Sequence, residues 1–253
     1  MEEKKISEIK AEYDEILEDE LDGFIQEYIS DCRPGVAKII GIAQKRMEKL
    51  RVEKERIEAL KFYENKYSDY EFICGIDEVG RGPLAGPVVA SAVILPKDCD
   101  ILYINDSKKL SEKRREDLYD KIMTKAVAVG VGIASWERID EINILNATYE
   151  AMREAISKLD PKPTLLLNDA VTIPQVDIKQ VAIVKGDAKS ISIGAASIIA
   201  KVTRDRMMVD YDKEFPGYAF AENKGYGTAA HIAALKSLGP CEIHRRSFIG
   251  NFI

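Results

Sequence analysis

From residue 71 onward, short apolar runs alternate with longer segments in which apolar positions recur at helical spacing. The short runs have the length and composition of buried strands, and the longer segments those of helices. The predicted strands are residues 72–76, 88–95, 126–134, 164–167 and 180–184. The predicted helices are residues 112–125, 140–159, 191–211 and 229–238, with Ser111 as the N-cap of the first. Because strands and helices alternate, we predict an α/β fold with a central mixed sheet flanked by helices.

Residues 1–70 follow a different pattern, rich in Glu, Lys, Ala, Ile and Leu and poor in Gly and Pro. Residues 31–35 include Pro34 and Gly35 and predict a break between helices. Residues 36–63 then place apolar side chains at helical spacing and charges on the other face. We therefore expect a helical N-terminal extension over residues 1–70 that packs on a main domain over residues 71–253. An arm that contacts nucleic acid is the alternative interpretation of the extension.

Composition places the chain among ordinary globular proteins, with 46% apolar and 32% charged residues over 253 positions. No apolar run reaches the roughly 18–20 residues that cross a bilayer. The charged N-terminus has no secretory signal, so we expect a cytoplasmic protein. The four cysteines are far apart and form no CxxC pair, which argues against a zinc site or a disulfide framework.

The net charge of −6 argues weakly against a nucleic-acid partner, but the charge is unevenly distributed. Residues 1–70 carry 13 Lys and Arg against 18 Asp and Glu, whereas residues 180–253 carry 10 against 7. An acidic protein can therefore still present a basic face in its C-terminal part.

Acidic residues directly follow three of the predicted strands. Asp77 and Glu78 come after the first strand, Asp169 after the fourth and Asp187 after the fifth. A carboxylate beside a buried strand is costly unless its desolvation is compensated, and Mg²⁺ or Mn²⁺ compensates clustered carboxylates well. Two such ions can activate a water and stabilise the leaving oxygen of a phosphodiester. Solvated turn residues or helix N-caps are the alternative interpretation of these acids.

Glycine and basic residues occupy the turns near these acids. Gly80, Arg81 and Gly82 let the backbone approach a ligand closely, and an arginine there can donate two hydrogen bonds to a phosphate. The spacing fits neither a P-loop nor a dinucleotide-binding fingerprint. Tyr226 stands between two glycines and could stack on a sugar or a base. The further candidates for phosphate contacts are Lys108, Lys185, Lys189, Lys224 and Arg245.

The order of these segments along the chain identifies a protein family far more specifically than any single segment does. The sequence GIDEVGRGPLAGPV at residues 75–88 is followed in order by DSKKL at 106–110, IDEINIL at 139–145, Asp169, KGD at 185–187, AASIIAKV at 195–202, KGY at 224–226 and HRRSF at 244–248. This series resembles ribonuclease HII, the type 2 ribonuclease H family, in a bacterial form with a helical N-terminal extension. The resemblance spans residues 72–249.

The resemblance implies a ribonuclease H-like fold in which Asp77, Glu78, Asp169 and Asp187 hold two Mg²⁺ or Mn²⁺ ions. It also implies that the turn 80–82 and Tyr226 sense the ribose 2′-hydroxyl, the group that distinguishes RNA from DNA. The implied activity is cleavage of RNA in RNA/DNA hybrids and nicking of duplex DNA on the 5′ side of an embedded ribonucleotide, which leaves a 3′-hydroxyl and a 5′-phosphate. Such an enzyme serves DNA repair and replication, and we expect it to act as a monomer away from membranes.

Two alternatives stay open. One is another nuclease of the same fold, such as type HIII, whose N-terminal domain is built on a sheet. The other is a nucleic-acid-binding protein with an inactive site, against which the presence of all four acids speaks.

Overall fold

The computed structural model describes residues 4–253, which divide into two compact units, one ending at Ala59 and the other beginning at Leu60. In this part of the chain, none of the helices is both long enough and apolar enough to cross a membrane.

The N-terminal unit is helical, as the sequence pattern predicts. It contains α1 (Ile6–Glu15), α2 (Leu21–Tyr28) and α3 (Pro34–Leu60), whose last residue already belongs to the second unit. Pro34 opens α3 at the position where a missing N–H costs nothing. Phe24 packs its ring against Tyr13 and Tyr28 in the unit's small core. The predicted break at residues 31–35 is confirmed, because α2 ends before it and α3 begins within it.

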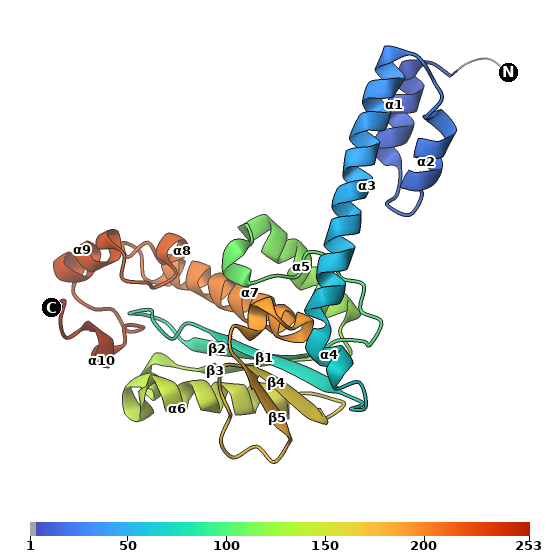
Figure 1. The fold of residues 1–253 in the computed structure, drawn as a ribbon. Coiled ribbons are helices and arrows are strands. Elements are labelled where there is room, and N and C mark those ends of the chain that lie inside the picture. The colour runs from blue at the N-terminus through green and yellow to red at the C-terminus, as the bar shows by residue number, and fades with distance from the viewer. Residues whose placement is uncertain (1–3) are drawn as a thin grey trace. The chain divides into compact units, whose positions relative to one another are not determined.

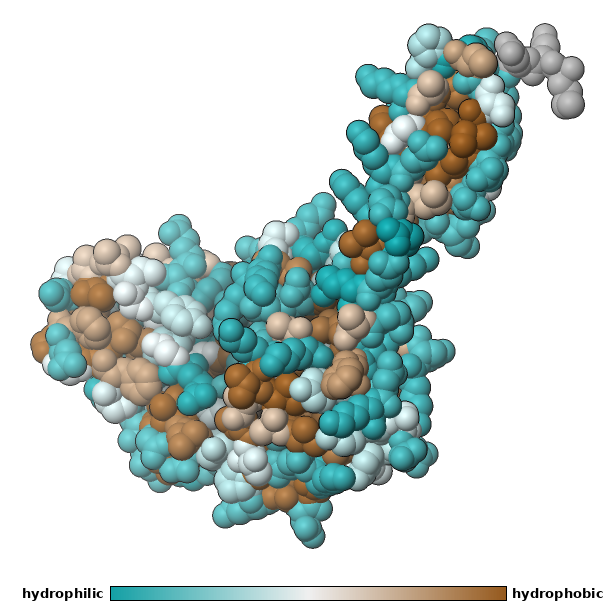
Figure 2. Space-filling view, viewed as in Figure 1, coloured by the Kyte–Doolittle hydropathy of each residue, from teal (hydrophilic) through white to brown (hydrophobic). Residues whose placement is uncertain are grey.

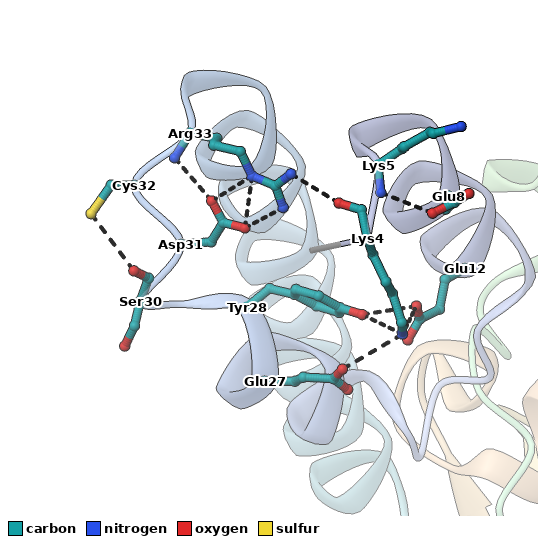
Figure 3. Close-up of polar contacts among 10 residues, drawn as sticks. All are labelled: Lys4, Lys5, Glu8, Glu12, Glu27, Tyr28, Ser30, Asp31, Cys32 and Arg33. Carbon is teal, nitrogen blue, oxygen red and sulfur yellow. Dashed lines mark hydrogen bonds and ion pairs between the residues drawn. The ribbon is translucent and has the colours of Figure 1, made fainter. Parts of the chain in front are cut away.

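Polar contacts join the first described residues to the turn after α2 (Figure 3). Lys4 Nζ donates to Tyr28 Oη at 2.6 Å and pairs with Glu12 at 2.9 Å. Arg33 pairs with Asp31 at 2.6 Å and donates to the Lys4 carbonyl at 2.9 Å. Ion pairs at or near the surface contribute little to stability, so the apolar core stabilises this unit more than these charges do.

The second unit is built on a five-stranded sheet of order β3-β2-β1-β4-β5 (Figure 1). Its strands are β1 (Ile73–Val79), β2 (Val88–Ile94), β3 (Ala128–Ala134), β4 (Leu165–Asp169) and β5 (Gln180–Ile183). β2 is antiparallel to both β1 and β3, whereas β1, β4 and β5 are mutually parallel. The mixed sheet predicted from the sequence is therefore confirmed, and the carboxyl ends of β1, β4 and β5 meet at one edge.

Helices cover both faces of this sheet (Figure 1). The remaining helices are α4 (Phe62–Lys66), α5 (Glu112–Lys125), α6 (Trp136–Ser157), α7 (Ile191–Glu214), α8 (Phe220–Asn223), α9 (Ala229–Leu238) and α10 (Arg246–Ile249). Cys74 and Ile76 of β1 join the core formed with α6, whereas Gly75 between them faces α7. A Cβ on Gly75 would lie 2.1 Å from the Ser192 carbonyl carbon, so α7 approaches the sheet closely here. Alternation along the strand then directs Asp77 toward α7 as well.

Figure 2 shows hydrophilic residues over most of the visible face of each unit, with apolar patches among them. Large apolar side chains that stay exposed include Leu17 and Ile29 in the first unit and Val184 and Leu238 in the second.

Most predicted helix bounds hold, but α6 differs. α5 begins after Ser111, whose hydroxyl accepts from Arg114 N, and α9 covers residues 229–238 as expected. α6 begins at Trp136 rather than at residue 140, because Ser135 caps it and Trp136 packs edge-on against Tyr211 of α7. Asn143, at φ 68°, breaks α6 internally, and its side chain caps the second half by accepting from the amide of Leu145.

Candidate active site

Asp77 is the most buried acid at the edge where the parallel strands end. It is 7% exposed, and its side chain accepts from Glu78 N at 2.8 Å. Burial raises the pKa of Asp77 well above its usual range, and the charge of Glu78 raises it further, while a hydrogen bond from Ser197 of α7 opposes both. An ionised Asp77 therefore needs a positive partner in this site.

Glu78 carries an unsatisfied oxygen. Arg81 Nη1 lies 3.3 Å from Glu78 Oε1, whereas Oε2 is buried and has no hydrogen-bond partner. Burial raises the pKa of Glu78, and the nearby charges of Arg81 and Lys108 oppose this rise. A buried carboxylate oxygen without a donor is an available ligand for a cation.

Asp169 and Asp187 reach the same edge from β4 and from the turn after β5. Ile76 pairs with Asn168, so Asp77 and Asp169 are the next residues on adjacent parallel strands. Asp169 Oδ1 accepts from Gly186 N at 2.7 Å, which ties β4 to the 3-10 turn η2 (Gly186–Ala188) that contains Asp187. Burial raises the pKa of Asp187, as do the charges of Asp106 and Asp169. The structure thus brings together all four acids predicted from the sequence.

The donor set suits a hard divalent cation, since four carboxylates repel one another here and one oxygen is unpartnered. Within residues 4–253, no three Asp, Glu, His or Cys side chains already stand close enough together to enclose a metal ion. Mg²⁺ commonly takes one or two protein carboxylates and completes its shell with water and substrate phosphate. The residues therefore fit an ion that is held jointly with substrate.

Three neighbours of these acids were not singled out by the sequence pattern as individual residues. Asp106 caps the 3-10 turn η1 (Ser107–Lys109) and adds a fifth charge beside Asp187. Ser107 and Ser197 share a hydrogen bond of 2.9 Å between their hydroxyls, next to Asp77. All three belong to segments that carry the family resemblance, which was the signal available, but only the fold shows that η1 and α7 meet there.

The turn 80–82 continues into a loop that ends at Pro87, and two buried arginines hold this loop. Arg245 was expected to contact phosphate, but it is fully buried. Its guanidinium donates to the carbonyls of Gly80, Arg81, Pro83, Gly86 and Pro87. With its donors engaged by the loop, Arg245 has none left for a phosphate, and its contribution is to the shape of the loop.

Tyr226 lies close to this turn. Its side chain is 39% exposed, and a Cβ on Gly82 would lie 4.0 Å from Tyr226 Cε1. Arg204, also fully buried, places its guanidinium carbon 5.9 Å from the Tyr226 ring centre. The structure therefore joins the two elements expected to face the ribose.

The predicted phosphate-binding lysines differ in their surroundings. Lys108, Lys185 and Lys189 are exposed on turns beside the acids. Lys224 is half-buried, and its ammonium donates to the Ala221 carbonyl. Three of the four lysines are thus free to reach a nucleic-acid backbone as the structure stands.

Glu64 of α4 is a further residue that the sequence analysis missed. Its Oε1 accepts from Ser190 Oγ at 2.5 Å and from Ser192 N at 3.0 Å, at the N-terminus of α7. Negative charge is favourable at a helix N-terminus. The N-cap of α7, Ser190, lies three residues after Asp187. Glu64 thereby connects the segment after α3 to the turn that carries Asp187.

Comparison with known proteins agrees with this geometry. Residues 74–251 match the family model described as Ribonuclease HII, and residues 5–68 match the one described as Ribonuclease HII N-terminal domain. The ribonuclease HII of Lachnoclostridium phytofermentans is 66% identical over 247 residues, which cover 98% of this chain and 97% of that protein. The crystal structure of ribonuclease H2 from Pyrococcus horikoshii superposes with a TM-score of 0.58 at 29% identity, over 70% of this chain and 93% of that one. Ribonuclease HII of Archaeoglobus fulgidus, solved in complex with PCNA, gives 0.59 at 29% identity, over 71% and 96%.

Proposed function

Because the chain belongs to the ribonuclease HII family, we propose that this ribonuclease H-type hydrolase cuts RNA in RNA/DNA hybrids and nicks duplex DNA on the 5′ side of an embedded ribonucleotide. The observation that carries the proposal is the convergence of Asp77, Glu78, Asp169 and Asp187 at one sheet edge, beside a turn that lies close to Tyr226. The products are a 3′-hydroxyl and a 5′-phosphate. The match of residues 5–68 to the type HII N-terminal model, together with their helical structure, favours type HII over type HIII.

We assign the four acids as the ligands of two divalent ions, Mg²⁺ or Mn²⁺. Bound there, the ions would lower the pKa of a water and stabilise the departing 3′-oxygen. Asp77 is the most buried of the four acids, so we assign it the position shared by the two ions. Asp169 holds the Asp187 turn in place through Gly186, so these two acids act as one unit.

The substrate contacts follow from the surroundings of the acids. We assign the turn 80–82 and Tyr226 to the ribose, since both lie at the rim of the site and Tyr226 is accessible. Arg81 orients Glu78 by donating to its Oε1. Lys108, Lys185 and Lys189 contact the phosphate backbone, with Lys224 at the edge of this surface. We keep residues 1–70 as the helical extension and 71–253 as the catalytic domain, although the compact units divide after Ala59.

The test is to replace Asp77 or Asp187 with Asn and to assay nicking of a DNA duplex that carries one ribonucleotide. We expect each variant to lose more than about 100-fold in rate, since metal-ion stabilisation of the transition state amounts to several kcal/mol. Full activity in both variants would refute the assignment of the acids.

A further inference from the structure

Arg204 of α7 and Arg245 are an unusual pair, because both are fully buried without a carboxylate partner. Neither forms an ion pair anywhere within residues 4–253. Burial lowers the pKa of Arg245 to about 9, and the charge of the nearby Arg204 contributes to this lowering. Buried charges are costly unless they are fully hydrogen-bonded, so the contacts that compensate them indicate what the pair does.

Backbone carbonyls compensate the two guanidiniums, and nearly all of these belong to the loop 80–87. Arg204 donates to the carbonyls of Ala85, Pro87 and Lys224, at 3.1, 2.9 and 2.8 Å. Arg245 donates to five loop carbonyls, the shortest contact being 2.6 Å to Gly80. Together the pair fixes six of the eight carbonyls in a loop that has little regular secondary structure.

These contacts also determine where the loop directs its amide groups. In a planar trans peptide the C=O and the following N–H point in opposite directions. Because Arg245 holds the carbonyls of Gly80 and Arg81, the N–H groups of Arg81 and Gly82 point away from the buried guanidinium. N–H groups that point outward from a turn backed by positive charge suit an electronegative oxygen of a ligand.

Arg204 joins this loop to Tyr226. It holds the Lys224 carbonyl on one side and the loop carbonyls on the other, and its guanidinium faces the Tyr226 ring. The fit is tight, because a Cβ on Gly80 would lie 2.4 Å from Arg204 Nε, and one on Gly225 would lie 2.5 Å from the Ala85 carbonyl oxygen. Gly80 and Gly225 also have φ of +94° and +82°, which favour glycine.

We propose that Arg204 and Arg245 are positioning residues for specificity, which aim the Arg81 and Gly82 amides and the Tyr226 ring at the ribose and thereby set the preference for ribonucleotide over deoxyribonucleotide. The inference rests on the proposed function of the site. Neither arginine touches substrate. The pair acts through the shape of the loop, so its loss affects discrimination more than the chemistry at the acids.

The experiment uses the full chain with Arg204→Lys and Arg245→Lys, which keep the charge but lose the forked set of donors. Arg206→Lys and Arg246→Lys are the matched controls, since both residues are exposed neighbours of the buried pair. For each protein, kcat and KM are measured on a duplex with one ribonucleotide. Binding of that duplex and of an all-DNA duplex of the same sequence is compared by fluorescence anisotropy in Ca²⁺.

We expect both buried-site variants to raise KM and to reduce the ribonucleotide-to-DNA binding ratio at least 10-fold, with kcat changed less than KM, while the controls stay within 2-fold of the parent protein. A folded variant with the parental KM and binding ratio would overturn the inference. So would a variant that loses activity only through a smaller folded fraction, with unchanged discrimination in what remains.

If both lysine variants fail to fold, Gly225→Ala tests whether the position of the loop sets the discrimination. Its Cβ would displace the loop at the Ala85 carbonyl while both arginines are kept in the sequence. It should reduce discrimination in the same way, and unchanged discrimination in a folded Gly225→Ala protein would overturn the inference. Failure of the proposed function is a separate result, in which the parent protein itself does not cleave the ribonucleotide duplex.

Discussion

Replacement of Asp77 by Asn should make the metal-free protein more stable while it abolishes activity. Asp77 is buried, and both burial and the charge of Glu78 raise its pKa above the ordinary value of 3.8. An ionised Asp77 therefore destabilises the folded state when no cation is present. Asparagine keeps nearly the same shape and removes that charge.

The size of the effect follows from linkage between pKa and stability. Each unit by which folding raises the pKa of a carboxyl costs about 1.4 kcal/mol once the pH exceeds both values. Below pH 3.8 the carboxyl is protonated in both states, so the two proteins should differ little. As the pH rises from there, the unfolded state ionises first and the advantage of the Asn variant grows until the raised pKa is passed. A gain of 1 kcal/mol corresponds to about 2–4 °C in Tm for a chain of this size.

The assay is thermal unfolding at pH 7 in EDTA and again in Mg²⁺, with Asp98→Asn as a control at an exposed position. In EDTA the Asp77→Asn protein should melt at least 2 °C above the parent protein. In Mg²⁺ the order should reverse, since a ligand at 100 times its Kd stabilises the protein that binds it by about 2.7 kcal/mol. The reasoning would be refuted if the Asp77→Asn protein melted below the parent protein in EDTA. It would also be refuted if Mg²⁺ raised the Tm of the variant as much as it raises the Tm of the parent protein.

Three further predictions concern the supports of the site. Gly75→Ala should cost about 1–3 kcal/mol in urea unfolding, because its Cβ would lie 2.1 Å from the Ser192 carbonyl carbon; an unchanged midpoint would show that α7 can move. Glu64→Ala should cost about 1 kcal/mol by removing the acceptor at the N-terminus of α7, and Glu64→Gln should recover part of it. Equal midpoints for the two Glu64 variants would contradict this. Burial and neighbouring His231 lower the pKa of His244 to about 4, so stability should fall as pH drops from 6.5 toward 4. His244→Asn should flatten this dependence in urea midpoints, and a slope equal to that of the parent protein would contradict it.

Much of this fold could be predicted because apolar runs and helix caps depend on only a few neighbouring residues. The apolar run before Asp77 forms β1, and Ser111 caps α5 at the expected residue. β3 and β4, which are connected through α6, run in the same direction, as strands connected through a helix usually do. Because β2 is antiparallel to both β3 and β1, β4 is also parallel to β1. This is why acids that follow separate strands could be expected at one edge.

The features that depend on contacts between residues far apart in the sequence could not be predicted. The start of α6 depends on the local cap Ser135 and also on Trp136 meeting Tyr211, a contact that no local pattern contains. Arg245 stands beside Arg246 in a basic run, and nothing in that run distinguishes the buried residue from the exposed one. Its burial follows from the fold, in which its guanidinium donates to the carbonyl of Gly80, a residue 165 positions away in the sequence. Asp106 likewise joins the acids only through the position of η1.

Cleavage-site mapping on a DNA duplex that contains one ribonucleotide, with Mg²⁺ and Mn²⁺ in turn, tests the central claim most directly. We expect a single nick on the 5′ side of the ribonucleotide, with a 3′-hydroxyl and a 5′-phosphate at the ends, and we expect Asp187→Asn to abolish it. Absence of any nick with either metal, or cleavage that ignores the position of the ribonucleotide, would contradict it.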